Sequence, residues 1–237
     1  SPSGLTYARY NLHTQGIRGL IIKLIHAIQL RISKIIVSIN PRPKQFKFLN
    51  HKLTYLNHPY NDTTYSERSV EIPIALDIIS QYQPNQILEV GNTLNHYQEV
   101  SHKIVDKFEK GHNVINQDIL DFHPKTKFDL IISISTFEHI GFDDDQLDPD
   151  KILQTFNYCR KLLKPQGKLI FTVPIGYNPF LDKLIFSHKP MFNKLTFLIR
   201  TSWSNQWKLS TRAEVRNLKY SSYYNNAQAI VVGEIHN

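Results

Sequence analysis

The feature that most constrains the fold is a regular alternation of short apolar runs and helical stretches between residues 86 and 173. The apolar runs lie at 86–90, 103–108, 113–116, 128–134 and 168–173. Runs of this length, bounded by polar or glycine-containing turns, indicate buried strands. Strands that alternate with helices pair in parallel through crossovers. The pattern therefore predicts an α/β fold with a doubly wound, mostly parallel sheet.

The last third of the chain has a different pattern, in which β-prone runs are separated by turn residues. The runs at 194–209 and 227–235 are predicted to pair as an antiparallel hairpin. Added to the parallel strands, they predict a seven-stranded sheet with an antiparallel C-terminal edge hairpin. An N-terminal helical extension is expected to precede this sheet.

Two parts are expected: an N-terminal extension at 1–65 and a single domain at 66–237. Residues 17–39 predict a basic amphipathic helix, and four interrupting basic or histidine side chains argue against a membrane span. Packing on the domain or on a partner, and peripheral contact with a membrane, both remain open for this helix. Residues 44–66 are expected to be irregular, and a helix is expected to begin near Ile72-Pro73, since proline suits a first turn.

The charge of the chain narrows the classes of partner. The net charge is +8, and the excess lies mostly before residue 53 and within 151–220. A basic balance suits nucleic acid or an anionic membrane, but no nucleic-acid-binding motif is present, so no specific nucleic acid is predicted. The lone Cys159 excludes an intrachain disulfide, and no Cys-His set has zinc spacing. A reducing, cytoplasmic location is expected.

Three motifs resemble those of class I S-adenosylmethionine (SAM)-dependent methyltransferases, across about residues 66–237. They are ILEVGN at 87–92, FDLIISISTFEHI at 128–140 and RKLLKPQGKLIFTVP at 160–174. In the first motif Glu89 and Gly91 match the family pattern, whereas Asn92, Thr93 and Asn95 stand where small residues and two further glycines are usual. Asn tolerates left-handed geometry better than most residues, so the turn can form without those glycines.

The resemblance implies a Rossmann-like fold, SAM as cofactor and a set of cofactor-binding residues. An acid after the second strand accepts the ribose hydroxyls; Asp106 is the candidate and Glu109 the alternative. Asp118 would receive the adenine amino group, with Ile119 packed on the ring, and Ser135 belongs to the strand end, Ser133 to Thr136, that would face the methionine part. The full implied set comprises Glu89, Gly91, Asn92, Asn95, Asp106, Asp118, Ile119 and Ser135.

Methyl transfer from a sulfonium mainly requires alignment of a nucleophile and exclusion of water. A hydroxyl acceptor also needs a base, and His139 is the candidate because its intrinsic pKa lies near neutrality; the alternative is that it caps a helix or braces a loop. Tyr177 and Asn178 either line the acceptor pocket or shape their turn. Some relatives hold a metal with Glu-x-x-Glu-His, but Ser135 replaces the first glutamate here, so no catalytic metal is predicted.

The motifs together predict a SAM-dependent methyltransferase that methylates an oxygen of a small-molecule or saccharide-type acceptor. The rival hypothesis is a catalytically inactive Rossmann-like module that binds a cofactor or docks a partner. The glycine-poor first motif favours this rival.

Overall fold

The computed structural model describes residues 28, 31–32, 35, 39, 42–187 and 191–237. Most of the segment predicted as an amphipathic helix, 17–39, therefore lies outside the described residues. Four isoleucines of its predicted apolar face are described, and each is 41–78% exposed: Ile28, Ile32, Ile35 and Ile39. Within the part of the chain that is described, no helix is long and apolar enough to span a membrane.

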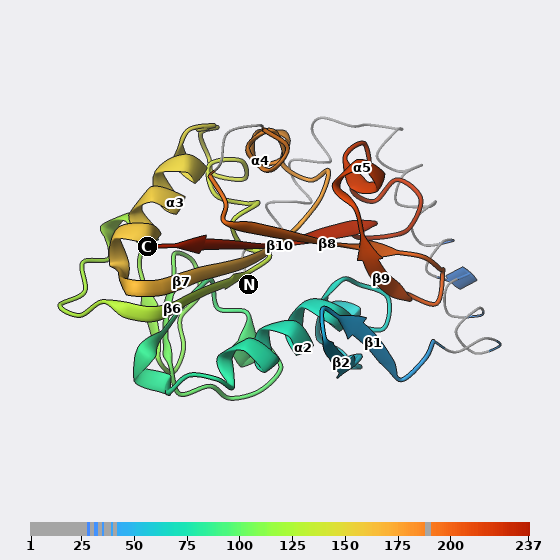
Figure 1. Ribbon diagram of the computed structural model, residues 1–237, viewed down its shortest axis with the longest axis horizontal. Coiled ribbons are helices and arrows are strands. Elements are labelled where there is room, and N and C mark those ends of the chain that lie inside the picture. The colour runs from blue at the N-terminus through green and yellow to red at the C-terminus, as the bar shows by residue number, and fades with distance from the viewer. Residues whose placement is uncertain (1–27, 29–30, 33–34, 36–38, 40–41, 188–190) are drawn as a thin grey trace.

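A single large sheet organises the described residues (Figure 1). In sequence order its strands are β3 (Ile87–Val90), β4 (Lys103–Asp106), β5 (Val114–Asn116), β6 (Phe128–Ile134), β7 (Leu163–Pro174), β8 (Lys194–Arg200), β9 (Trp207–Ser210) and β10 (Ala229–His236). Their spatial order is β5-β4-β3-β6-β7-β10-β8-β9. The first five pair in parallel, whereas β10 is antiparallel to both β7 and β8. The fold is thus Rossmann-like and doubly wound, as predicted.

Two details of the predicted sheet were wrong. Among the described residues the sheet has eight strands rather than seven, because 194–209 folds back on itself as the β8–β9 hairpin. The turn at 201–206 closes it, with the Thr201 amide donating to the Gln206 carbonyl at 2.8 Å. The last strand, β10, lies inside the sheet between β7 and β8 instead of at its edge. Its nearly continuous burial suits a strand with neighbours on both sides.

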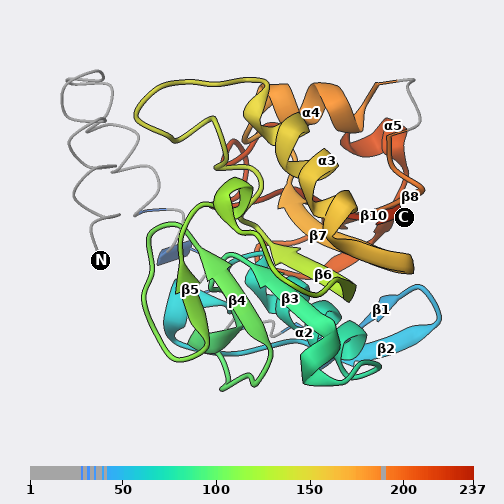
Figure 2. The ribbon, with the colours of Figure 1, turned by 90° about the vertical axis from the view of Figure 1, so that its left-hand side faces the viewer.

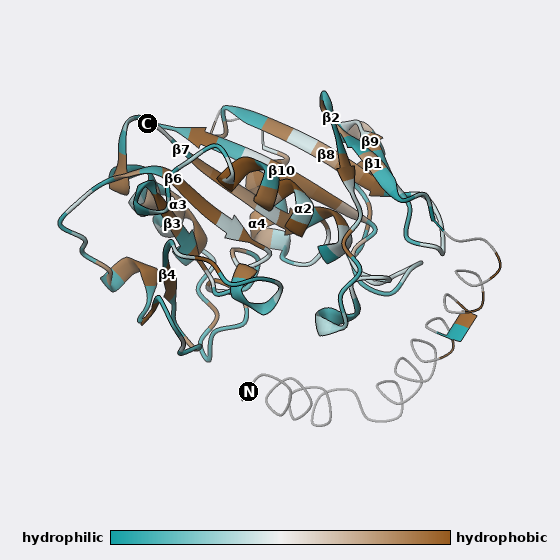
Figure 3. Ribbon diagram, turned by 90° about the horizontal axis from the view of Figure 1, so that it is seen from below, coloured by the Kyte–Doolittle hydropathy of each residue, from teal (hydrophilic) through white to brown (hydrophobic). Residues whose placement is uncertain are grey.

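Each face of the sheet is covered by its own layer (Figures 1 and 2). One face carries α3 (Lys151–Leu162), α4 (Pro179–Ile185) and α5 (Arg212–Val215). The other carries α2 (Arg68–Ile79) with a separate hairpin of β1 (Gln45–Phe48) and β2 (His51–Thr54). Successive strand residues alternate between the two cores, as Ile131 and Ile132 of β6 do. Figure 3 shows the apolar colour concentrated on the central strands and α2.

Single-turn 3-10 helices complete the connections. They are η1 (Tyr60–Asp62), η2 (Pro84–Gln86), η3 (Leu94–His96) and η4 (Ile119–Asp121). Between β3 and β4 the described chain forms only the short turn η3. The turn η3 is held in place because the Leu94 side chain is buried in the core.

Segment 44–66 is not irregular, as the sequence suggested, but opens with the β1–β2 hairpin. Phe46, Phe48 and Tyr55 are buried in the core beneath α2, which explains why this polar-looking segment is ordered. The Tyr55 hydroxyl accepts the Trp207 amide at 2.8 Å and so ties the segment to β9. A division between extension and domain at residue 65 stays a prediction.

The start of α2 also differs from expectation. The helix begins at Arg68, and Pro73 lies inside it. Proline has no N–H, so the carbonyl four residues earlier, that of Ser69, loses its helical partner. The Leu56 amide donates to this carbonyl at 3.0 Å instead. A tertiary contact therefore compensates for the internal proline, and no local sequence pattern predicts this contact.

Gly233 of β10 offers a test of the core. A Cβ added there would lie 2.2 Å from the ring of Phe171 on β7. We expect Gly233→Ala to lower the free energy of unfolding by about 2 kcal/mol, because the buried ring has little room to move. Urea denaturation measures the change. Gly111→Ala is the matched control, since its nearest neighbour would be Val114 Cγ2 at 3.5 Å; an equal effect at both positions would contradict the packing argument.

Candidate functional site

The candidate site lies at the carboxyl ends of the parallel strands, where connections leave β3 and β6 toward opposite sides of the sheet. Ligands of doubly wound sheets bind in the crevice at such a point. Two pieces meet there: the first turn, Gly91–Leu94 after β3, and the loop Ser135–Asp143 after β6. All the residues predicted from the motifs lie on or next to these pieces or on the neighbouring strand ends.

Glu89 holds the first turn in place. Its Oε1 accepts the amides of Thr93 and Leu94 at 3.0 and 2.9 Å. Its Oε2 contacts His102 Nε2 at 2.8 Å, and both side chains are buried. Because the Glu89 carboxylate is fully enclosed, it can act on a cofactor only through the conformation of this turn.

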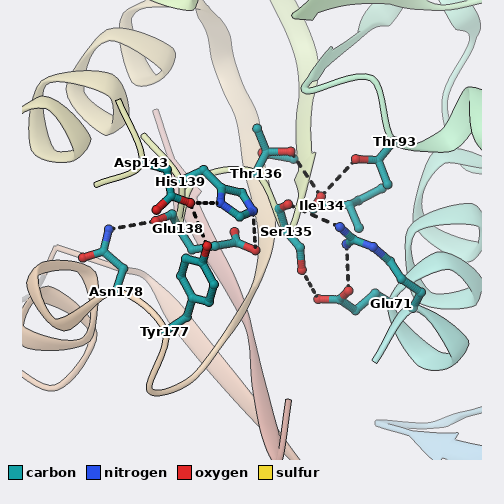
Figure 4. A network of polar contacts seen from close by, with 12 residues as sticks. Glu71, Thr93, Ile134, Ser135, Thr136, Glu138, His139, Asp143, Tyr177 and Asn178 are labelled. Atoms are coloured by element: carbon teal, nitrogen blue, oxygen red, sulfur yellow. Dashed lines mark hydrogen bonds and ion pairs between the residues drawn. The ribbon is translucent and has the colours of Figure 1, made fainter. Parts of the chain in front are cut away.

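Gly91 lets the loop after β6 approach closely. It has φ +90°, and a Cβ there would lie 2.1 Å from Thr136 Oγ1. Thr93 and Thr136 both donate to the Ile134 carbonyl, at 3.1 and 3.2 Å (Figure 4). The two pieces are thus joined through one carbonyl. The Thr136 side chain fills the space next to Gly91 that the missing Cβ leaves.

Asp106, at the end of β4, is already engaged with backbone donors. Its Oδ2 accepts the Asn92 amide at 2.8 Å, and its Oδ1 accepts the amides of Phe108 and Glu109 at 2.8 and 2.7 Å. Glu109 Oε2 accepts Asn92 Nδ2 at 2.7 Å. Asn92 Oδ1 in turn accepts Asn95 Nδ2 at 2.9 Å. The structure therefore brings Asn92 of the first turn and the neighbouring Asn95 together with both candidate ribose acids, which lie at or just after the end of the next strand.

The two predicted adenine residues have other contacts. Asp118 caps η4 by accepting the Leu120 amide at 3.1 Å, and its Oδ2 lies 2.9 Å from Lys151 Nζ. Lys151 Nζ also lies 2.7 Å from Asp144 Oδ2, which ties the predicted adenine position to the loop before α3. Ile119 is 5% exposed and packs in the core. Contact of either residue with a cofactor stays a prediction.

A polar cavity of about 230 Å³ opens beside these turns. Its walls come from the start of α2, the loop after β6, the loop after β7 and the segment 220–226. Three predicted residues line it: Ser135, His139 and Tyr177. Arg68, Glu138 and Tyr220 also line it, and none of them was predicted as a site residue. Glu138 could have been recognised as a neighbour of His139, but nothing local places Arg68 or Tyr220 here.

An ion pair joins the cavity-lining Arg68 to the buried Glu71. Arg68 Nη1 lies 2.9 Å from Glu71 Oε2, and Ser135 Oγ donates to Glu71 Oε1 at 2.8 Å (Figure 4). Burial raises the pKa of Glu71, and Arg68 opposes that rise. Burial would lower the pKa of Arg68, but the nearby carboxylates of Glu71, Glu138 and Glu67 raise it overall. Ser135 is thus held by α2 through its side chain and by β7 through its amide, which donates to the Thr172 carbonyl at 2.8 Å.

Glu138 is the most unusual carboxyl group of the site. It is 2% exposed, and its Oε2 has no hydrogen-bond partner among the described residues. Burial raises its pKa to about 7, against the opposing effects of His139 and Arg68. A buried oxygen without a partner is unfavourable unless a ligand supplies a donor. Glu138 therefore marks where a donor of a bound molecule would fit.

His139 is held by acidic partners. Its Nδ1 lies 2.5 Å from Asp143 Oδ2, which also accepts the Tyr177 hydroxyl at 2.7 Å (Figure 4). Its Nε2 lies 3.7 Å from Glu138 Oε1. Desolvation would lower the pKa of His139, but the carboxylates of Glu138 and Asp143 outweigh it and raise the pKa. A catalytic role for His139 stays a prediction, and these contacts also suit the bracing alternative.

Tyr177 and Asn178 differ in position: Tyr177 lines the cavity, whereas Asn178 shapes the turn after β7. Tyr177 lines the cavity and contacts the ring of Tyr220 edge-on at 5.1 Å. Asn178 is 2% exposed and caps α4, with its Oδ1 accepting the amides of Phe180 and Leu181. Its Nδ2 donates to the Glu138 carbonyl at 2.9 Å. Asn178 thus shapes the turn and positions Glu138, and a direct contact with an acceptor stays a prediction.

No group of three or more His, Cys, Asp or Glu side chains suited to a metal ion occurs among the described residues.

Comparisons with known proteins give only distant likenesses. No protein-family model and no curated protein matches the chain. Among solved structures, N-methyltransferase NodS from Bradyrhizobium japonicum, in complex with S-adenosylhomocysteine, is 12% identical over 67% of this chain and 81% of that one, with a TM-score of 0.39. A SAM-dependent methyltransferase from Archaeoglobus fulgidus is 13% identical over 70% and 94%, with a TM-score of 0.41. These likenesses are too distant to carry function, so the assignment of the fold depends on the strand order of the chain itself.

Glu138 makes stability depend on pH in a direction that can be tested. A carboxyl group whose pKa rises on folding, here from 4.5 to about 7, contributes stability at low pH and loses it as pH rises through that interval. At about 1.4 kcal/mol for each pH unit, the loss is about 3 kcal/mol. We expect Glu138→Gln, which cannot ionise, to gain stability over the parent protein by that order between about pH 4 and pH 8.

Urea unfolding across this pH range measures the difference. Glu99→Gln, at an exposed position, is the control and should follow the parent protein throughout. A constant difference between Glu138→Gln and the parent protein at every pH would show that the carboxyl group does not titrate in this interval.

Proposed function

We propose that the protein is a SAM-dependent methyltransferase that methylates a hydroxyl of a small-molecule or saccharide-type acceptor. One observation carries the proposal: the adjacent residues Ser135 and Thr136 belong to both halves of the site. Ser135 lines the polar cavity, and Thr136 lies against Gly91 of the first turn. A cofactor at the first turn and an acceptor in the cavity would therefore meet at this loop.

The residues present fit a SAM molecule at the strand ends with one local change. A carboxylate offers about four acceptor positions, and three backbone amides use only part of the capacity of Asp106. Asp106 and Glu109 can thus still accept ribose hydroxyls, and Asn92 would line the same turn. Thr136 must rotate away from Gly91 to admit the methionine part. When bound, SAM would supply a methyl group that is already electrophilic.

The cavity suits a small, hydroxyl-bearing acceptor. Its volume of about 230 Å³ is slightly below the roughly 300–1,000 Å³ typical of ligand pockets. Its walls carry carboxyl, guanidinium and hydroxyl groups, and Tyr177 and Tyr220 add flat apolar faces beside polar tips. Such a lining matches a compact polyol or sugar unit better than an apolar molecule.

SAM binding tests the cofactor assignment. We expect calorimetric titration to show binding by the full chain and Asp106→Ala to weaken it about tenfold or more, because hydrogen bonds to a charged acceptor are lost. Asp121→Ala, at an exposed position, is the control and should bind like the parent protein. Thermal unfolding without SAM should show that each variant is folded, since Asp106 also binds backbone amides.

The rival function is an inactive module with this fold, and the Thr136 side chain against Gly91 favours it. Absence of SAM binding at millimolar concentration would replace the enzyme proposal with this rival. Binding with unchanged affinity in Asp106→Ala would leave the enzyme proposal standing and reject Asp106 as the ribose acid.

A cytoplasmic protein with peripheral membrane contact through 17–39 is a second part of the proposal. Basic residues of this segment and the exposed isoleucines Ile28, Ile32 and Ile39 support it. Each Lys or Arg side chain near an anionic membrane surface contributes about 1 kcal/mol to the binding free energy. We expect Lys23→Glu with Lys34→Glu to reduce co-sedimentation of the full chain with phosphatidylglycerol vesicles about tenfold or more.

The matched control reverses two exposed lysines elsewhere, Lys125 and Lys127. It should sediment like the parent protein, and neutral phosphatidylcholine vesicles should bind all forms weakly. Equal sedimentation of both double variants with anionic vesicles would remove the membrane contact from the proposal.

A further inference from the structure

We infer that Glu138, rather than His139, is the group that takes the proton from the acceptor hydroxyl, and that His139 positions it. The inference rests on the proposed methyl transfer and names the base of that same site.

The placement of Glu138 carries the inference. Its side chain lines the cavity, is 2% exposed and keeps Oε2 without a partner among the described residues. Its backbone is fixed, because Asn178 Nδ2 donates to the Glu138 carbonyl at 2.9 Å. An acceptor hydroxyl that donates to Oε2 would give this buried oxygen a partner and be oriented by it.

The charges around Glu138 keep it able to accept a proton. Arg68 and Glu71 of α2 act on the charge of Glu138, and His139 adjoins it on its own loop. Glu67, just before α2, lines the same cavity. The tyrosines Tyr177 and Tyr220 also line the cavity. Burial raises the pKa of Glu138 to about 7, so that both protonation forms are populated near neutrality, which is optimal for a general base.

His139 is less suited to this role. Its Nδ1 is bound to Asp143, which also accepts the Tyr177 hydroxyl, and its pKa is raised by the two neighbouring carboxylates. A protonated imidazole has no lone pair to offer. With Nε2 at 3.7 Å from Glu138 Oε1, a protonated His139 stabilises the ionised carboxylate instead.

The proton and electrons balance within this arrangement. The hydroxyl proton moves to Glu138 Oε2 while the hydroxyl oxygen forms its new bond to the methyl carbon. The electron pair of the broken carbon–sulfur bond stays on sulfur, which becomes a neutral thioether. The positive charge of the sulfonium and the negative charge of Glu138 are thereby both removed, and the products are a methyl ether and a protonated Glu138.

The first test follows Glu138 directly and needs no acceptor. In protein labelled with carbon-13 at the glutamate side-chain carboxyl, the resonance absent from Glu138→Gln is that of Glu138. We expect this resonance to titrate with a midpoint of about 7. His139→Gln should move the midpoint upward, because a positive neighbour is lost. A midpoint in the ordinary range of glutamate, about 4 to 5, would overturn the inference.

The second test compares variants in methyl transfer from radiolabelled SAM to a panel of methyl glycosides. We expect Glu138→Gln to lower kcat/KM about 100-fold or more with unchanged SAM affinity, as loss of a general base does. Glu138→Asp should restore part of the rate. His139→Gln should lower it about tenfold or less and shift the pH profile toward higher pH, since it acts through Glu138. Glu99→Gln is the control.

The outcomes separate this inference from the proposed function. If the parent protein transfers methyl groups and Glu138→Gln keeps more than about a third of the parent kcat/KM, the inference fails and the proposed function stands. Such a loss is far smaller than the loss expected when a general base is removed. A greater loss in His139→Gln than in Glu138→Gln would likewise return the role of base to His139. If the parent protein does not bind SAM, the proposed function fails and the inference fails with it.

Discussion

Burial of the central sheet on both faces is the constraint on which the rest of the structure depends. Because α2 and the β1–β2 hairpin cover one face and α3 to α5 cover the other, the inner parallel strands β3 and β6 are enclosed along nearly their whole length. Polar chemistry is thereby directed to the carboxyl edge, where Gly91 ends β3 and Ser135 follows β6. The same layers bring α2 over that edge, so a structural helix also supplies part of the cavity wall.

The site combines rigid support with an incomplete hydrogen-bond network. Glu89 is satisfied on both oxygens by the first turn and His102. Glu71 is satisfied by Arg68 and Ser135. In the same neighbourhood, Glu138 Oε2 has no hydrogen-bond partner in the described part of the chain. Since buried carboxyl groups are normally paired, the contrast separates groups that hold the loops from a group that is available to a ligand.

Most of the parallel sheet could be predicted because apolar runs and turns are local signals. The order of β8, β9 and β10 could not, because it depends on which strand finds neighbours on both sides. Pro73 misled the prediction of α2 for a similar reason: its cost is offset by the Leu56 amide, a contact made only in the folded chain. At the site, motif order located Asp106, Ser135 and His139, but the cavity wall formed by Arg68 and Tyr220 comes from distant segments.

The sequence by itself determined the class of fold, the edge of the sheet that carries polar groups and the loops that meet there, because periodicity and turn residues act over short distances. Only the tertiary structure decided how those groups are engaged. It enclosed Glu89, placed Thr136 against Gly91 and left Glu138 Oε2 without a partner among the residues that the structure describes. Burial and hydrogen bonding depend on segments far apart in the chain, and they set the protonation and availability of each side chain.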